Sequence, residues 1–227
     1  MNDQTRISEA GDAYQAIMDA IVTQQLAPSQ KVSENLLSDM FGISRTVART
    51  LIERLVSQQF MVNLSPRITI VAPLTLHEIK QNFTLRKMLL PSILSLAAAT
   101  ADFKRLEELS HEIEALLRPS TDDEALALLK KNKEINIALC ESVGFPLMHD
   151  WVHQLEDGAM RIYWLYLKRL KSMPYTADQH VMAIEVMRCD EPSRVRAIVH
   201  DILSQAEDRI MNTIFSSQQF SGQDLKI

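Results

Sequence analysis

The chain has 227 residues, of which 46% are hydrophobic and 23% are charged, and its formal net charge at pH 7 is −5. This length allows one large domain or two modest ones, and only 5 glycines and 8 prolines favour a mostly helical protein. The acidic balance argues against a nucleic-acid binder that relies on overall charge, and the two cysteines argue against a disulfide scaffold.

The cysteines and the N-terminal residues indicate the compartment. Cys140 and Cys189 lie within apolar helical patterns without CxxC spacing, so we expect buried free thiols in a reducing environment. Residues 1–12 are polar and lack the apolar run of a signal peptide, and nowhere are 18 consecutive residues apolar. The sequence therefore predicts a soluble cytoplasmic protein with no membrane association.

The N-terminal part begins with a predicted amphipathic helix over residues 9–24. Residues 31–54 then predict two short helices joined by a tight turn, in which Ser33 and Ser44 are placed as N-caps. Gly42 supplies the backbone freedom that a helix end needs. The predicted inner faces consist of Tyr14, Ile17, Met18 and Ile21, then Leu36, Leu37 and Met40, then Val47, Leu51, Ile52 and Leu55.

The second helix of this pair carries its polar side chains near its N-terminus. Arg45, Thr46 and Arg49 fall on its outward face, where a helix-turn-helix carries the side chains that read a DNA groove. An ordinary helical hairpin with solvated arginines is the alternative. Residues 1–74 hold 6 Lys and Arg against 7 Asp and Glu, but between Arg45 and Arg67 four arginines face one acid. This local excess is sufficient for DNA contact and predicts weak non-specific binding.

The periodicity changes after residue 59. Residues 60–64 and 68–71 are short β-type runs around the turn Ser65-Pro66-Arg67. A helix-turn-helix followed by a two-stranded hairpin is a winged helix, and Arg67 is the residue at the wing tip best placed to touch DNA. We therefore expect a winged helix-turn-helix domain over residues 1–74.

The remainder of the chain, residues 75–227, predicts an all-α helical bundle. Only helical periodicity follows the wing, interrupted at prolines and at Gly144. The fold class is therefore mainly α, with an N-terminal winged helix-turn-helix and a C-terminal bundle. The six expected helices cover residues 75–99, 102–117, 122–143, 146–171, 177–189 and 192–214.

In this order, the chain resembles a GntR-family transcription regulator of the FCD (FadR C-terminal domain) branch, in its shorter six-helix form. The likeness runs over nearly the whole chain, and the resemblance implies that Ser44, Arg45, Thr46, Arg49 and Arg67 contact DNA. The residues that carry it are Leu26-Ala27-Pro28, Val32-Ser33-Glu34, Leu37, Phe41-Gly42-Ile43-Ser44-Arg45-Thr46, Arg49, Leu55 and Val71. The chain departs from the family pattern at Val47, Ala48 and Thr50, and Ile68 stands where family wings carry glycine.

The same resemblance implies a site inside the bundle. FCD domains often bind a divalent metal through Asp-x-x-x-His and two later histidines, and here the matching positions are Asn132, Asn136, His180 and His200. Because an amide is a poor main ligand for a transition metal, we expect a divalent ion such as Zn²⁺ or Ni²⁺ to bind weakly or not at all. The alternative is that the two histidines are hydrogen-bonded and partly buried.

Without a metal, the four residues Asn132, Asn136, His180 and His200 would line a cavity for a small polar ligand. Arg86 and Arg161 match family positions that face this cavity, and either could hold a carboxylate effector. For Arg161 a solvated helix face is the alternative. His149 and His153 also stand four residues apart, and we expect a surface pair rather than a metal site.

No catalytic constellation is present, since the chain lacks GxSxG, P-loop, HExxH and dinucleotide-binding motifs. The sequence predicts a DNA-binding regulator and not an enzyme. We expect a homodimer that binds a double-stranded operator, represses a metabolic operon and responds to a small-molecule effector. The alternative is a protein of the same fold that has lost effector sensing and acts as a constitutive DNA-binding or dimerisation scaffold.

Overall fold

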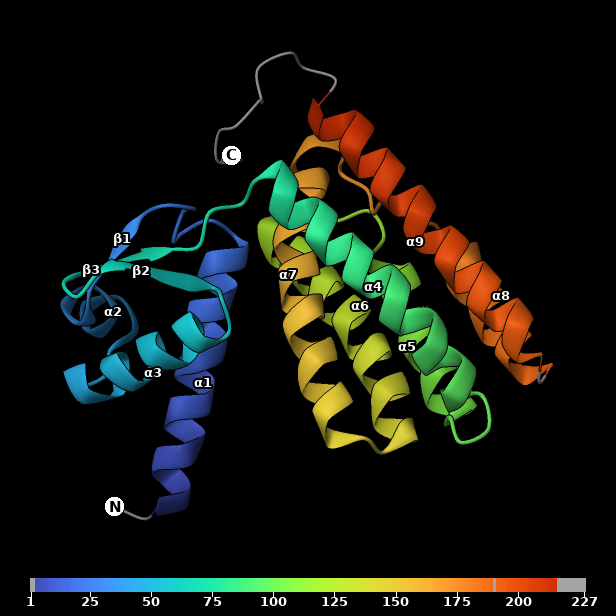
Figure 1. Cartoon of the computed structure of the whole chain (residues 1–227), viewed down its shortest axis with the longest axis horizontal. Coiled ribbons are helices and arrows are strands. Elements are labelled where there is room, and N and C mark those ends of the chain that lie inside the picture. Colours follow the sequence, from blue (N-terminus) through green and yellow to red (C-terminus); the bar gives the residue numbers. More distant parts are fainter. Residues whose placement is uncertain (1–2, 190, 216–227) are drawn as a thin grey trace. The chain divides into compact units, whose positions relative to one another are not determined.

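The computed structural model describes residues 3–189 and 191–215, which fall into two compact units (Figure 1). The first unit ends at Thr75 and the second begins at Leu76. In the part of the chain that is described, no helix is long and apolar enough to cross a membrane.

The first unit contains three helices, α1 (Asp3–Val22), α2 (Glu34–Phe41) and α3 (Arg45–Ser57). Their apolar faces meet in one core, which includes Ile17 and Met18 from α1, Leu37 from α2 and Leu55 from α3, none more than 1% exposed. The predicted caps are confirmed, because Ser33 and Ser44 accept hydrogen bonds from the backbone of Leu36 and Val47. Gly42 ends α2 in the left-handed region, with φ 66°.

Three strands complete the first unit, β1 (Lys31–Val32), β2 (Met61–Ser65) and β3 (Ile68–Val71), in the order β1-β3-β2 with antiparallel pairing. The predicted hairpin is confirmed as β2 and β3. The strand β1 was not predicted, because two residues are too short to show a period. The two residues just before β1 set its position by pairing with the end of β3. Ser29 N donates to Val71 O, and Val71 N donates to Gln30 O.

Two predictions for the first unit were wrong in detail. The helix α1 begins at Asp3 rather than near residue 9, since polar residues can extend a helix once it is nucleated. It ends at Val22 because Gln24 adopts a left-handed conformation, with φ 61°. Met40 was expected on the inner face of α2, but its side chain is 42% exposed, and Phe41 packs against the core instead.

The second unit is all-helical, and its six predicted helices are confirmed to within a few residues at each end. The helix α4 packs along α9, and α6 packs along α7 (Figure 1). Phe83, Tyr163 and Trp164 are its largest fully buried side chains. The helices are α4 (Leu76–Ala97), α5 (Phe103–Leu116), α6 (Asp122–Val143), α7 (Pro146–Leu170), α8 (Ala177–Arg188) and α9 (Pro192–Phe215).

A glycine allows α4 and α7 to approach closely. A Cβ atom added at Gly158 would lie 2.8 Å from Nδ2 of Asn82, which in turn donates a hydrogen bond of 2.8 Å to the carbonyl of Leu155. The two helices are therefore joined by a side-chain-to-backbone bond, and a methyl group at Gly158 would have to displace the Asn82 amide that makes it. This contact lies next to the polar cluster described below.

The two cysteines differ in their surroundings. Cys140 is buried and free, as expected, and burial raises the pKa of its thiol. Cys189 is free but exposed, so the expectation that it is buried was wrong. The reason is that Cys189 is the C-cap residue of α8 and no longer lies on the inner face of that helix.

Candidate functional site

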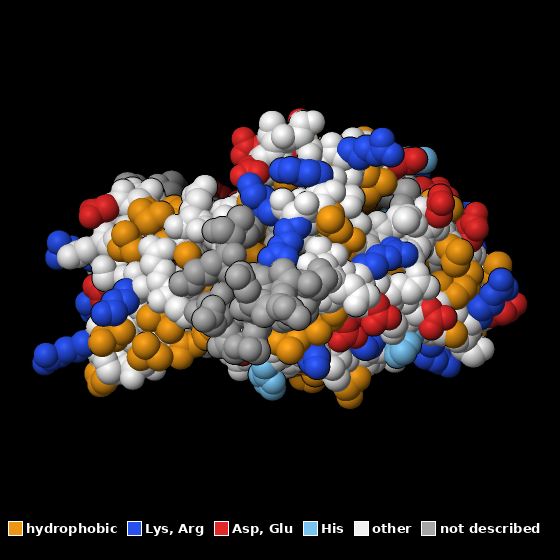
Figure 2. Space-filling model, turned by 90° about the horizontal axis from the view of Figure 1, so that it is seen from above, with side chains coloured by type: hydrophobic (Ala, Val, Ile, Leu, Met, Phe, Trp, Pro, Cys, Tyr) orange, Lys and Arg blue, Asp and Glu red, His pale blue; other side chains and the backbone are white. Residues whose placement is uncertain are grey.

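The N-terminus of α3 presents the predicted polar side chains to solvent. Ser44, Arg45, Thr46 and Arg49 are all exposed, while Ala48, on the face of α3 that packs on the core, is fully buried. Figure 2 shows Lys and Arg side chains at the left of the view, over the first unit, with hydrophobic side chains among them. Because one face of α3 is buried and the opposite face is polar and exposed, α3 meets the geometric requirement for a recognition helix.

Arg49 is held by an acid of the preceding helix. Its Nε lies 2.7 Å from Oε1 of Glu34, and its Nη2 lies 3.2 Å from Oε2, so the pair is joined at two points. The side chains remain 65% and 33% exposed. The hydrogen bond from Arg49 lowers the pKa of Glu34, and the bond to Glu34 raises the pKa of Arg49. Glu34 therefore adds a negative charge to the outward face of the helix pair.

Of the four arginines between residues 45 and 67, Arg54 is turned toward α1. Its guanidinium carbon lies 3.9 Å from the ring centroid of Tyr14, whose hydroxyl donates a 2.8 Å hydrogen bond to Gln58. This cation–π contact fixes α3 to α1. Arg45, Arg49 and Arg67 remain as the basic side chains that can face DNA. Together with Ser44 and Thr46 we call them the reading surface.

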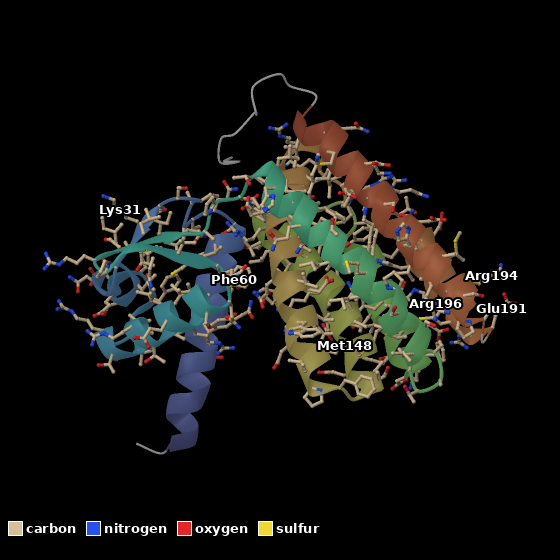
Figure 3. All side chains as sticks on the ribbon, in the orientation of Figure 1. Lys31, Phe60, Met148, Glu191, Arg194 and Arg196 are labelled. Atoms are coloured by element: carbon tan, nitrogen blue, oxygen red, sulfur yellow. The ribbon has the colours of Figure 1, made fainter. Side chains whose placement is uncertain are left out.

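The wing tip combines one basic side chain with two apolar ones. Arg67 is exposed, Leu64 is 62% exposed at an irregularity in the β2–β3 pairing, and Ile68 is 36% exposed. Ile68 lies in β3 without a positive φ, so its bulk does not strain the turn. Lys31 is exposed on β1, the other edge of the sheet (Figure 3).

The second unit contains a buried ion pair between α4 and α7. Arg86 and Glu156 are 2% and 1% exposed, and Nε and Nη2 of Arg86 lie 3.0 Å and 2.9 Å from Oε1 of Glu156. Arg86 also donates a hydrogen bond to the hydroxyl of Tyr163, and Asn136 of α6 donates one of 3.1 Å to Oε2 of Glu156. We call these four residues the Arg86 cluster.

The charges of the cluster are balanced internally. Burial lowers the pKa of Arg86, but Glu156 and Tyr163 together raise it above its ordinary value, so the guanidinium stays charged. Burial raises the pKa of Tyr163, which stays neutral. The cluster is therefore a desolvated ion pair, in which Tyr163 accepts a hydrogen bond from the cation and Asn136 donates one to the carboxylate.

Aromatic rings extend the cluster toward α8. The ring of Tyr175 lies 5.7 Å from that of Tyr163 and 4.8 Å from that of His180, measured between centroids. Burial lowers the pKa of His180 to about 4, so its imidazole is neutral at pH 7. Tyr175 is 6% exposed, and its hydroxyl has no hydrogen-bond partner within the described residues.

The structure brings together some of the predicted effector residues and separates others. Arg86 and Asn136 belong to the cluster, Asn132 is 3% exposed on the same helix, and Arg161 is 6% exposed, so the solvated-face alternative for Arg161 was wrong. His200 is 55% exposed beside Asp201 and is not joined to the cluster. Glu156, Tyr163 and Tyr175 were not predicted, although Glu156 and Tyr163, seven residues apart, share one face of α7.

The residues present do not fit a divalent metal. No group of three or more His, Cys, Asp or Glu side chains is arranged to hold an ion within residues 3–189 and 191–215. Asn136 directs its amide nitrogen toward Glu156, and that carboxylate is already paired with a guanidinium. A dication beside Arg86 would also meet like charge, so the donor chemistry opposes metal binding.

His149 and His153 pack against each other at a centroid separation of 4.4 Å. His149 lies 3.5 Å from a carboxylate oxygen of Glu141 and 3.8 Å from one of Asp150, and it is 32% exposed. Burial and the charge of Lys133 lower the pKa of His153 to about 4. The pair forms part of the helix packing at the start of α7.

Comparison with known proteins gives one family match and several similar folds. The model of the FCD domain family matches residues 81–205, more than half of the chain. E. coli McbR/YncC shares 15% identity and a TM-score of 0.75, over 90% of this chain and 97% of that one. A transcriptional regulator GntR from Rhodococcus sp. RHA1 shares 15% identity and a TM-score of 0.67, over 90% and 98% of the two chains. No curated protein matches the sequence.

Proposed function

The chain belongs to the FCD-domain branch of the GntR family of transcription regulators, and on this premise we propose that it is a ligand-responsive, DNA-binding repressor of a metabolic operon. The observation that carries the proposal is the N-terminus of α3, which is capped by Ser44 and exposes Arg45, Thr46 and Arg49. Regulators of this family are not enzymes, and we assign no reaction to this chain.

The DNA-contacting residues of the proposal are Ser44, Arg45, Thr46 and Arg49 in the major groove and Arg67 at the wing. An arginine at the start of a recognition helix reads guanine bidentately or holds a phosphate. Because the first unit is slightly acidic as a whole, most of the affinity must come from these few contacts. We therefore expect a low non-specific affinity and a large loss on removal of either Arg45 or Arg49.

The test is the substitution of single arginines. Duplexes selected by the wild-type protein from a random pool supply the probe, and binding is measured by fluorescence anisotropy. Arg45→Ala and Arg49→Ala should each weaken binding by ten-fold or more, since a bidentate contact is worth about 1–3 kcal/mol. Arg194→Ala is the control, because Arg194 is exposed at the start of α9 with one acidic neighbour, Glu191 (Figure 3). Unchanged binding by both recognition-helix variants would contradict the proposal.

We further propose that the second unit forms a homodimer, so that two recognition helices face half-sites about one helical turn apart. An effector bound in the second unit would alter their spacing with a coupling of about 1–3 kcal/mol. The alternative function, a constitutive DNA-binding scaffold, is favoured by the internal pairing of Arg86 with Glu156. Growth-medium metabolites that raise the thermal midpoint and also change DNA affinity would exclude the scaffold.

A further inference from the structure

We propose that Glu156 is an internal carboxylate ligand that occupies Arg86 in the place of an acidic effector, so that the second unit selects against carboxylates and works without a metal. The proposal deepens the effector role proposed above and rests on it only for the biological meaning. The chemistry at Arg86 stands on the geometry of the cluster itself.

All three guanidinium nitrogens of Arg86 face partners within the chain. Its Nε and Nη2 both face one oxygen of Glu156, and its Nη1 donates to Tyr163. A carboxylate from outside would compete for these nitrogens, because each of the two bidentate edges of the guanidinium includes Nη2, which already faces Glu156. Glu156 therefore competes directly with an acid for Arg86, and it does so from within the chain at a very high effective concentration.

The ion pair between Arg86 and Glu156 is buried. Both partners of the ion pair are at most 2% exposed, so water cannot compensate either charge if the pair is opened. An entering anion would leave Glu156 uncompensated and would place two negative charges at one guanidinium. A neutral ligand carries neither cost, and the hydroxyl of Tyr175, which has no partner among residues 3–189 and 191–215, can donate to a carbonyl, ether or hydroxyl oxygen of such a ligand.

Glu156 also joins the helices α4, α6 and α7. Glu156 of α7 accepts bonds from Arg86 of α4 and from Asn136 of α6, so one carboxylate connects three helices. A metal ion held by side chains from several helices would make a connection of the same kind. Here an organic cation and a carboxylate make it, which agrees with the poor donor set at Asn132 and Asn136.

The experiment frees Arg86 and supplies a carboxylate from solution. Thermal unfolding of Glu156→Ala, which leaves a space of about the size of acetate beside Arg86, is followed in sodium acetate and in sodium chloride at equal ionic strength. The variant should unfold at a lower temperature than the wild type in chloride, and acetate should restore much of the difference in a saturable manner. The wild type should show no difference between the two salts.

Two further variants show whether the acetate acts at Arg86. Arg86→Met/Glu156→Ala removes the guanidinium as well, so acetate should have no effect on it. Glu191→Gln opens an exposed acid–arginine pair with Arg194, 3.8 Å apart (Figure 3), and acetate should again have no effect. An acetate response that persists in the double variant assigns the anion to another cation, such as Arg161, and overturns the proposal.

The outcomes remain distinct if Glu156→Ala fails to fold in chloride. Refolding is then followed by circular dichroism with and without acetate, and recovery of helical signal only with acetate supports the proposal. No acetate effect on stability or on refolding overturns it. A stoichiometric transition metal found by elemental analysis of the purified wild type also overturns the metal-free part. None of these readouts uses DNA, so failure of the regulator proposal would be seen separately.

Discussion

Arg49 of α3 and Glu34 of α2 are joined at two points across the turn of the helix-turn-helix, at 2.7 Å and 3.2 Å. The pair fixes the direction of an arginine on the reading surface before any DNA is present. It also places a carboxylate where phosphates would approach. Both side chains reach solvent, Arg49 at 65% and Glu34 at 33% exposure, so the pair adds little to stability and we expect its main effect on DNA binding.

Replacing Glu34 by Gln should raise the affinity for a mixed-sequence duplex by about two- to five-fold at low salt, because one repelling charge is removed. The gain should shrink as salt is added. Fluorescence anisotropy over a salt series measures it, and Arg49→Ala/Glu34→Gln should show a gain over Arg49→Ala as well, because the carboxylate repels phosphates with or without its partner. Weaker binding by Glu34→Gln would mean that the acid orients Arg49 productively.

The cap of the recognition helix can be separated from its DNA contact. Ser44→Ala removes the acceptor for the backbone N–H of Val47 and should lower the free energy of unfolding by about 1 kcal/mol. Ser44→Asp keeps a capping oxygen, so its stability should stay near that of the wild type, while its negative charge should abolish DNA binding. Urea unfolding and anisotropy report the two effects. Equal DNA affinity for Ser44→Asp and wild type would remove Ser44 from the interface.

The close approach of α4 and α7 predicts a large cost for one methyl group. Gly158→Ala places a Cβ 2.8 Å from Nδ2 of Asn82 and should destabilise the protein by about 1–3 kcal/mol, despite the better helix propensity of alanine. Gly11→Ala in α1 is a matched control, since no atom lies within 4 Å of the added carbon. It should be neutral or stabilising by up to about 1 kcal/mol. Urea denaturation of both variants checks the sign.

The partly buried His180 beside Tyr175 predicts a loss of stability in mild acid. The pKa of His180 is about 4 in the folded chain and about 6.5 in an unfolded one. The unfolded chain therefore binds the proton first, and this contribution to stability is complete above pH 6.5 and is lost as the pH falls toward 4. His180→Asn should lose less stability between pH 7 and pH 5 than the wild type. His111→Asn, at a histidine 81% exposed, should behave as the wild type.

Much of the fold followed from local signals. The caps Ser33 and Ser44 and the glycine Gly42 act on backbone groups within three or four residues, so the helices that they bound could be read from the sequence. The two-residue strand β1 carried no such signal, because its pairing partner lies about 38 residues later in β3. Exposure at helix ends, as for Met40 and Cys189, also depended on neighbours that no local pattern names.

By itself, the sequence determined the helices, the helix-turn-helix with its outward Arg45, Thr46 and Arg49, and the family to which the chain belongs. Only the tertiary structure decided how the charges inside the second unit are compensated. Arg86 and Glu156 are 70 residues apart and meet only because α4 packs on α7. The energy of a buried charge is set by the few atoms that touch it, and those atoms are chosen by packing rather than by neighbours along the chain.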